Sequence, residues 1–313
     1  MATGFYTNPI YLEHDTGNHP ENADRLRAID KHLRYSGLLN ELEMRPGCTA
    51  ELKEIQLLHS KKYIDSIREA AELGRGILGT PDCIISPGTF GAALHAVGAV
   101  LDSVVQVADN KIDNAFCAIR PPGHHAEHDA AMGFCFLNNV AIAAEFLQKN
   151  FGYQRILIFD FDVHHGNGTQ HLFEKSEKVL YASTHQDPRT CYPGTGFAHE
   201  TGFGSGKGFT LNFPLPPGTT DDRYLEFFQN KIIPQFEDYK PDFILLSAGF
   251  DGHTRDPLAM LDLTENCYHE ITKQMRTLAE KFASGRLVSL LEGGYDLEAL
   301  ALSVEAHIQA LLH

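Results

Sequence analysis

Short apolar runs recur through the second half of the chain, separated by longer stretches with helical spacing. Several of these runs are apolar throughout and do not alternate, which is typical of strands that are covered on both faces. We therefore predict buried strands over Ala115–Ile119, Arg155–Phe161, Val179–Ser183, Phe209–Phe213, Asp242–Ser247 and Arg286–Leu291.

The stretches between these strands place apolar residues on one face of a helix. We predict helices over Leu137–Lys149, Asp221–Tyr239, Thr264–Ala283 and Leu297–Leu312, with Asp221 and Thr264 as N-cap residues. The first third is predicted to be mainly helical, over Glu21–Tyr35, Glu51–Leu73 and Thr89–Ala108. Strands that alternate with helices predict a parallel sheet with crossover helices, and so an α/β fold.

The composition is that of a folded enzyme. With 43% hydrophobic and 21% charged residues, the chain is expected to fold and not to be disordered. Asp and Glu number 41 against 26 Lys and Arg, which gives a formal net charge of −15. This balance argues against nucleic-acid binding, which depends on clustered Lys and Arg, and it suits a cationic partner.

Other features predict a cytoplasmic protein without a membrane segment. The apolar runs are shorter than the roughly 18 residues that a membrane helix needs. The first residues, MATGFYTNPIYLEHD, have neither the basic nor the apolar region of a secretory signal. The six cysteines are scattered without a C-x-x-C pair, so we expect them to be reduced. The pattern predicts no particular oligomeric state.

Polar residues gather at the ends of four predicted strands. Because the carboxyl ends of parallel strands meet at one edge of a sheet, ligands bind there in such folds. The residues at these ends include His124, His125, Asp160, Asp162, His164, Asp251 and Tyr295. The chain also has 17 histidines, a surplus that points to metal or proton chemistry. Together these observations predict an active site at one edge of the sheet.

Two carboxylates and one imidazole of this set are candidate ligands of a divalent metal ion. Asp162 and His164 are two positions apart, so in extended backbone their side chains point to one side. With Asp251 as the third ligand, a position remains for water, which is the pattern of a catalytic site. Zinc is the first choice for a mixed nitrogen and oxygen set, and Fe²⁺ or Co²⁺ would fit similar ligands.

The adjacent His124 and His125 follow a Pro-Pro-Gly turn that holds their backbone stiffly. Opposite a metal-bound water, one imidazole can act as general base and then as general acid. Asp160 is a candidate to orient an imidazole, and Tyr295 is a candidate to donate to a developing oxyanion. Each residue alone would more simply be a surface or packing residue, so the prediction depends on the whole set.

Several motifs resemble the histone deacetylase family, especially its class II branch and bacterial deacetylase-like amidohydrolases. They are RPPGHHAEHDAAMGFCFLNN, DFDVHHGNGTQ, CYPGTG, SAGFDGHTRDPL, LEGGYDL and the N-terminal HDTGNHPENADRLRAI. The resemblance implies the arginase-deacetylase fold, a three-layer α-β-α arrangement with a central, mostly parallel sheet of about eight strands. It also implies one deacetylase catalytic domain over residues 1–313.

The resemblance implies metal sites at specific residues. Asp162, His164 and Asp251 would be the zinc ligands. A structural potassium ion would be held by Asp160, Asp162, His164 and Ser183 with nearby backbone, and a second, weaker potassium site would involve Phe173 and Val179.

The resemblance also implies catalytic roles. His125 would be the general base and acid, His124 the second histidine held by Asp160, and Tyr295 the residue that polarises the carbonyl. Asn167 stands where class I relatives have a second Asp. His125 would therefore lack a carboxylate partner, which should lower its pKa relative to that of an Asp-paired histidine.

Four further residues would contact the substrate. Phe134 and Tyr192 would form the walls of a narrow tunnel for an acyl-lysine side chain, with the carbonyl of Gly133 at its base. Polyamine-selective relatives place an acidic residue after the Asp-Pro of the loop beyond the third metal ligand. This chain has Leu258 there, which favours an acyl-lysine or a less specific amide.

The function implied is zinc-dependent hydrolysis of an acyl-amide, first of all deacetylation of Nε-acetyl-lysine in proteins or peptides, by metal-activated water. An acetylpolyamine or other small acylated amine is the alternative substrate. An arginase-like enzyme with two manganese ions would need a further ligand where Gly166 stands. An inactive acyl-lysine-binding protein would have lost a ligand, the histidine pair or the tyrosine, and all of these are present.

Overall fold

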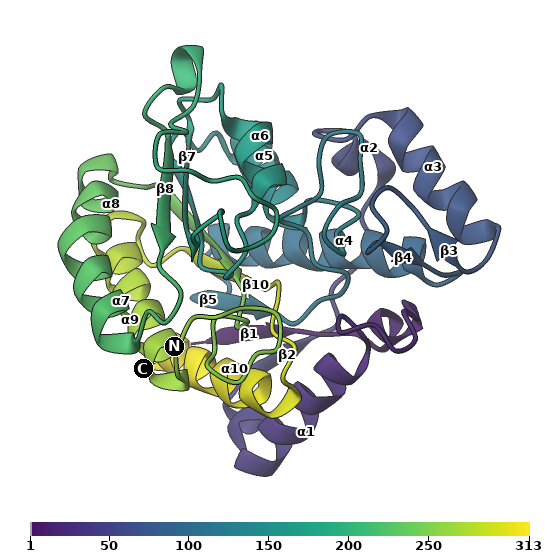
Figure 1. Ribbon diagram of the computed structural model, residues 1–313, viewed down its shortest axis with the longest axis horizontal. Coiled ribbons are helices and arrows are strands. Elements are labelled where there is room, and N and C mark those ends of the chain that lie inside the picture. The colour runs from purple at the N-terminus through teal and green to yellow at the C-terminus, as the bar shows by residue number, and fades with distance from the viewer. Residues whose placement is uncertain (1) are drawn as a thin grey trace.

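Eight parallel strands form the central sheet of the computed structural model, which describes residues 2–313 (Figure 1). Every pair of neighbouring strands in this sheet runs parallel, so the predicted α/β fold with a parallel sheet of about eight strands is confirmed. In spatial order the strands are β2 (Glu43–Arg45), β1 (Thr3–Tyr6), β5 (Asn114–Cys117), β10 (Leu287–Leu291), β9 (Phe243–Ala248), β6 (Ile156–Asp160), β7 (Val179–Gln186) and β8 (Thr210–Leu215).

Helices cover both faces of this sheet and give the three layers that the resemblance implied (Figure 1). One group comprises α2 (Leu52–Ile55), α3 (Lys61–Glu72), α4 (Thr89–Ala108), α5 (Asn139–Phe151) and α6 (Asn167–Phe173). The other comprises α1 (Asp24–Ser36), α7 (Asp221–Phe227), α8 (Ile233–Tyr239), α9 (Glu265–Phe282) and α10 (Leu297–Leu312). A short antiparallel pair, β3 (Gly76–Ile77) and β4 (Ile84–Ile85), lies outside the main sheet.

The central strands are apolar throughout because both of their faces are covered. All residues of β6, β9 and β10 are buried, and the buried apolar side chains form one cluster that runs from Phe5 to Leu312. Helix α4 is long and apolar enough to cross a membrane, with a mean hydropathy of 1.5. It packs against α5, β5 and β10 and is mostly buried, as a core helix of a folded domain is.

Two predicted helices are interrupted. The segment predicted over Asp221–Tyr239 forms α7 and α8 with a π-helical turn, Phe228–Ile232, between them. Pro234 lies at the start of α8 and has no N–H to continue the regular bonding pattern. The segment predicted over Glu51–Leu73 divides into α2 and α3, because Ser60 caps α3 by accepting a hydrogen bond from the Tyr63 N–H at 3.2 Å.

Asp221 is not an N-cap, and this prediction was wrong. It is the first residue of α7, and its carboxylate accepts hydrogen bonds from the backbone N–H and the hydroxyl of Thr264 at 2.8 and 2.5 Å. Thr264 does precede α9 as its N-cap residue, but its hydroxyl is used in this contact and not on its own helix. The pair therefore ties the starts of α7 and α9 together.

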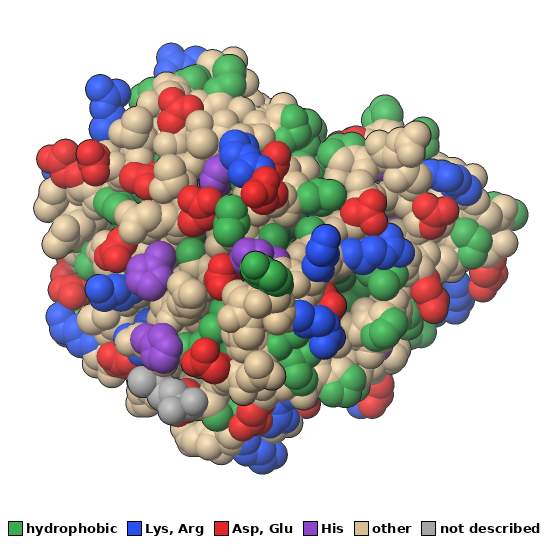
Figure 2. Space-filling model, turned by 90° about the horizontal axis from the view of Figure 1, so that it is seen from below, with side chains coloured by type: hydrophobic (Ala, Val, Ile, Leu, Met, Phe, Trp, Pro, Cys, Tyr) green, Lys and Arg blue, Asp and Glu red, His purple; other side chains and the backbone are tan. Residues whose placement is uncertain are grey.

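Charged side chains are spread over the face of the molecule that Figure 2 shows. On the face shown in Figure 2, acidic and basic side chains are interspersed, with hydrophobic and histidine side chains between them. On this face the acidic excess of the composition is therefore not gathered into one patch.

Candidate active site

Four adjacent strands deliver the predicted site residues to one edge of the sheet. In the order β5, β10, β9, β6, each strand is hydrogen-bonded to the next, although they are far apart in sequence. His124 and His125 follow β5, Tyr295 follows β10 and Asp251 follows β9. The β6 end supplies Asp160, Asp162 and His164. The sheet order is thus what brings these side chains together.

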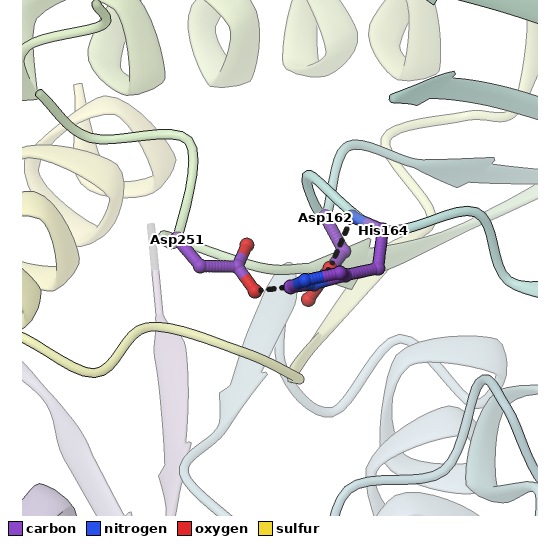
Figure 3. A group of neighbouring side chains, drawn as sticks. All are labelled: Asp162, His164 and Asp251. Atoms are coloured by element: carbon purple, nitrogen blue, oxygen red, sulfur yellow. Dashed lines mark hydrogen bonds and ion pairs between the residues drawn. The ribbon is translucent and has the colours of Figure 1, made fainter. Parts of the chain in front are cut away.

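The side chains of Asp162, His164 and Asp251 point toward one another (Figure 3). The His164 Nδ1 lies 3.1 Å from Asp162 Oδ1 and 3.0 Å from Asp251 Oδ2, and one potential ligand atom from each residue lies within 4.8 Å of the others. All three residues are buried. The prediction assumed extended backbone for Asp162 and His164, but both residues lie in a bend after β6. Their side chains nevertheless point to the same side.

Backbone groups hold the two carboxylates in place. The Gly293 N–H donates to Asp162 Oδ2 at 2.8 Å, and the Val163 N–H donates to Asp251 Oδ1 at 3.0 Å. A Cβ atom at Gly293 would collide with the carboxylates of both Asp162 and Asp251. Glycine at this position therefore allows the loop after β10 to close over the ligand group.

The electrostatics of this group suit a bound cation. Burial would raise the pKa of Asp162, but the imidazoles of His124 and His164 hold it well below its usual value. Burial and the charge of Asp162 raise the pKa of Asp251. Two buried carboxylates that face one imidazole repel each other unless a positive charge lies between them. The donor set of two oxygens and one nitrogen thus fits a divalent metal ion.

The two adjacent histidines have different partners. The His124 Nδ1 lies 3.1 Å from Asp160 Oδ2, while the His125 Nδ1 lies 2.7 Å from the amide oxygen of Asn167. Burial would lower the pKa of His124, but the carboxylates of Asp160 and Asp162 raise it to about 10. Burial and the neighbouring charge of His124 lower the pKa of His125 well below its usual value. The surroundings of His124 therefore favour its protonated form, and those of His125 favour its neutral form.

Glu292 is a buried carboxylate to which the sequence pattern assigned no role. Its Oε2 accepts hydrogen bonds from the N–H groups of Gly123 and His124 at 2.7 and 3.2 Å, and its Oε1 accepts from the Ser247 hydroxyl at 3.1 Å. Burial raises the pKa of Glu292 to about 7. Its place at the end of β10, directly before Gly-Gly-Tyr295, is the signal that would have identified it.

Arg25, a residue that the sequence pattern did not single out, contacts the loop that carries Tyr295. Arg25 donates to the carbonyl oxygens of Gly294 and Glu292 at 2.7 and 2.6 Å, and its guanidinium lies 5.1 Å from the centre of the Tyr295 ring. Burial and the charge of Asp251 raise the pKa of Tyr295 well above its usual value. The phenol is therefore protonated and can donate a hydrogen bond.

Two aromatic rings stand beside these groups. The Tyr192 ring lies 5.1 Å from the His125 ring, and the Phe134 ring lies 5.8 Å from that of Tyr295, both edge to face. Gly133 has a φ of +54°, and a Cβ there would collide with the His125 ring. The Gly133 carbonyl oxygen accepts a hydrogen bond from the thiol of Cys135 at 3.2 Å.

Leu258 is connected to the site through Asp256. The two oxygens of the Asp256 carboxylate accept from the N–H groups of Leu258 and Tyr295 at 3.0 and 2.7 Å. The Leu258 side chain is 38% exposed. It is therefore on an accessible loop that is linked to the backbone of Tyr295.

The potassium prediction stays a prediction. Asp160 and Ser183 are register partners on β6 and β7, but the Ser183 hydroxyl bonds the His185 Nδ1 at 2.8 Å. Phe173 and Val179 are the last residue of α6 and the first of β7.

The fold and the site define an α/β protein of the enzyme type, with its candidate catalytic groups at the carboxyl edge of a parallel sheet. A family model described as a histone deacetylase domain matches residues 19–311, and the chain belongs to this deacetylase family of hydrolases. A probable deacetylase of Archaeoglobus fulgidus is 40% identical over 95% of this chain and 82% of the relative. A histone deacetylase-like amidohydrolase of Pseudomonas aeruginosa is 37% identical over 89% of this chain and 73% of the relative. The crystal structure of the HDA15 HD domain superimposes with a TM-score of 0.93 at 34% identity, covering 99% of this chain and 88% of that chain.

Proposed function

We propose that this deacetylase hydrolyses acyl-amides with a zinc ion held by Asp162, His164 and Asp251, and that its preferred substrate is Nε-acetyl-lysine in a protein or peptide. The observation that carries the proposal is that His125 and Tyr295 follow β5 and β10, at the same edge of the sheet as β9 and β6, which supply the buried Asp-His-Asp group. These groups offer the three functions that metal-assisted amide hydrolysis requires, namely a cation site, a base and an oxyanion donor.

Zinc, when bound, supplies an activated water and polarises the amide carbonyl. His125 takes a proton from the attacking water at Nε2, since its Nδ1 is committed to Asn167. The same nitrogen then gives the proton to the departing amine, so that acetate and a free amine leave the site. The low pKa of His125 keeps this nitrogen unprotonated before the reaction begins.

Tyr295 and His124 stabilise the negative charge of the reaction. The Tyr295 hydroxyl donates a hydrogen bond to the substrate oxygen as it becomes an oxyanion. His124 contributes a fixed positive charge, because Asp160 and Asp162 keep it protonated. A preorganised donor and a fixed charge cost no reorganisation during the reaction, which is why such groups lower its barrier.

The substrate assignment is supported by the groups that flank the site. Phe134 and Tyr192 offer apolar walls that suit the methylene chain of an acylated lysine. The net charge of −15 favours the approach of lysine-bearing segments. Leu258 leaves its loop without the carboxylate that would select a polyamine. Acetylpolyamines and other small acylated amines are the alternative substrates.

Metal analysis combined with a substrate panel tests the proposal. Purified protein should contain about one equivalent of zinc, lose activity with a chelator and regain it with zinc. It should cleave acetyl-lysine peptides faster than acetylspermidine or a free acetylated amine. Failure to cleave any acyl-amide after zinc loading would refute the hydrolase function, and a preference for acetylspermidine would refute only the substrate assignment. The cytoplasmic location stays a prediction.

A further inference from the structure

A continuous line of hydrogen bonds leads from His125 to the surface. The His125 Nδ1 contacts Asn167 Oδ1 at 2.7 Å, and the Asn167 Nδ2 donates to Glu127 Oε1 at 2.6 Å. The same Glu127 oxygen lies 2.8 Å from the Nδ1 of His171. Glu127 contacts neither the Asp-His-Asp group nor the aromatic walls through any of these bonds, so its influence on the site passes through Asn167.

The donors and acceptors along this line have only one consistent arrangement. A carboxylate only accepts hydrogen bonds, so the amide nitrogen of Asn167 must face Glu127. The amide oxygen then faces His125, and because this oxygen also only accepts, the His125 proton must be on Nδ1. Nε2 is left with a free lone pair. Rotation of the amide by half a turn would present an N–H to Nδ1 and move the ring proton to Nε2.

The segments that carry these groups are tied together. Asn167 and His171 are four positions apart on α6 and so lie on one face of it. The backbone before Glu127 is fixed to the same helix, since the Thr169 N–H donates to the His124 carbonyl at 3.1 Å. The Glu127 side chain is 24% exposed, so its bond to Asn167 is shielded from much of the solvent that weakens surface contacts.

We propose that Glu127 is a positioning residue that orients the amide of Asn167 and thereby fixes the catalytic His125 with its proton on Nδ1. This role deepens the proposed function and rests on it, because only a catalytic His125 needs a free Nε2. A carboxylate at position 167 would accept from His125 with either oxygen and would need no such orientation. The Asn167 Nδ2 has two longer contacts, to the His125 carbonyl oxygen and to Met132 Sδ, each at 3.4 Å, so the short bond to Glu127 at 2.6 Å is the main one that orients the amide.

Single variants at position 127 give the first test. Glu127→Ala removes the acceptor and should lower kcat roughly 10-fold with little change in KM, a size typical of residues that orient an active-site histidine. Glu127→Gln can still present an oxygen to the Asn167 amide, so it should stay within roughly 3-fold of wild type. Glu177→Ala, which removes an exposed carboxylate close in sequence to α6, controls for the loss of one negative charge and should leave kcat unchanged.

The Asn167→Asp background separates positioning from mere structural support. There Glu127 faces a second carboxylate, so Glu127→Ala should be neutral or should raise kcat. An equal loss in both backgrounds would overturn the proposal, as would a Glu127→Ala enzyme within 2-fold of wild type. If Glu127→Ala does not fold, Glu127→Lys answers the same question. The lysine ammonium only donates hydrogen bonds, so in the wild-type background it favours the rotated amide of Asn167. In the Asn167→Asp background it pairs with the new carboxylate.

The ring proton of His125 can be read without any activity measurement. The ¹⁵N chemical shifts of the His125 ring nitrogens can be measured in zinc-loaded protein labelled at histidine and assigned by comparison with His125→Gln. In wild type they should report the Nδ1–H tautomer, and in Glu127→Ala they should report a partial or complete change to the other tautomer. An unchanged tautomer overturns the proposal. This measurement still decides the role of Glu127 if the enzyme cleaves no acyl-amide. An active wild type with an unaffected Glu127→Ala variant would refute the role of Glu127 and leave the proposed function standing.

Discussion

Glu21→Gln should destabilise the protein strongly, because the Glu21 carboxylate pairs with two buried guanidinium groups. Glu21, Arg25 and Arg120 are all completely buried. Glu21 Oε2 accepts from Arg120 Nη2 at 2.7 Å, Glu21 Oε1 is bonded to Arg120 Nε, and the same oxygen lies 3.3 Å from Arg25 Nη1. Glutamine keeps the shape of the side chain but removes the negative charge that faces both guanidinium groups.

The size of the loss follows from two independent routes. Breaking a buried pair by removing one charge costs about 3–5 kcal/mol. Burial would raise the pKa of Glu21, but Arg120 lowers it from 4.5 to about 2. A shift of that size corresponds to roughly 3 kcal/mol of stability at neutral pH. With an unfolding entropy of roughly 2 cal/mol/K per residue, such a loss lowers Tm by about 5–8 °C in a chain of this length.

The pH dependence gives the sharper assay. Since the pKa of Glu21 is lower in the folded protein, its contribution is complete above about pH 4.5 and is lost as pH falls toward 2. The difference in unfolding free energy between wild type and Glu21→Gln, measured by urea titration, should therefore be large at pH 7 and should shrink as the solution is acidified. Asp65→Asn, which removes a partly exposed partner of Lys61 and Arg68, should leave Tm nearly unchanged. A Tm loss below about 2 °C for Glu21→Gln, or a difference that does not depend on pH, would refute this reasoning.

Three further variants test the proposed chemistry. Tyr295→Phe should lower turnover roughly 100-fold or more with the zinc content unchanged, since it removes only the oxyanion donor, and near-normal turnover would exclude that role. Asp251→Asn should lose both zinc and activity, so a full equivalent of metal by elemental analysis would count against it as a ligand. Leu258→Glu should raise the ratio of acetylspermidine to acetyl-lysine peptide cleavage several-fold, because it adds a carboxylate to the accessible loop tied to Tyr295. An unchanged ratio would show that position 258 does not select the substrate.

The strands of the sheet centre could be predicted from the sequence because their signal is local. Both faces of β6, β9 and β10 are covered, so nearly every position is apolar. The strands β1 and β2 have only four and three residues, and β2 is largely exposed. Their pairing with the sheet depends on distant segments and not on their own pattern. The same holds for α6, which is too short for helical spacing to be recognised.

The buried polar residues likewise fall into those that the local sequence pattern reveals and those that only the fold reveals. Asp162, His164 and Asp251 are found at strand ends, where polar residues after buried strands are unusual enough to be noticed. Glu21 and Arg25 lie in a polar segment whose pattern is that of a solvated helix start, and nothing local shows that they are buried. Their burial depends on Arg120, which is 99 residues from Glu21 in sequence. Such pairs are visible only once the fold has brought the segments together.

The contrast between His124 and His125 shows how adjacent, identical side chains acquire different chemistry. The carboxylate of Asp160 stabilises the imidazolium of His124, while the hydrogen bond to the neutral amide of Asn167 does not offset the burial that lowers the pKa of His125. The positive charge of His124 then disfavours a second charge 4.0 Å away, so it lowers the pKa of His125 further. A carboxylate in place of Asn167 would oppose this effect and share the proton more evenly. The residue at position 167 therefore acts beside burial and the charge of His124 in setting how charge is divided between the two rings.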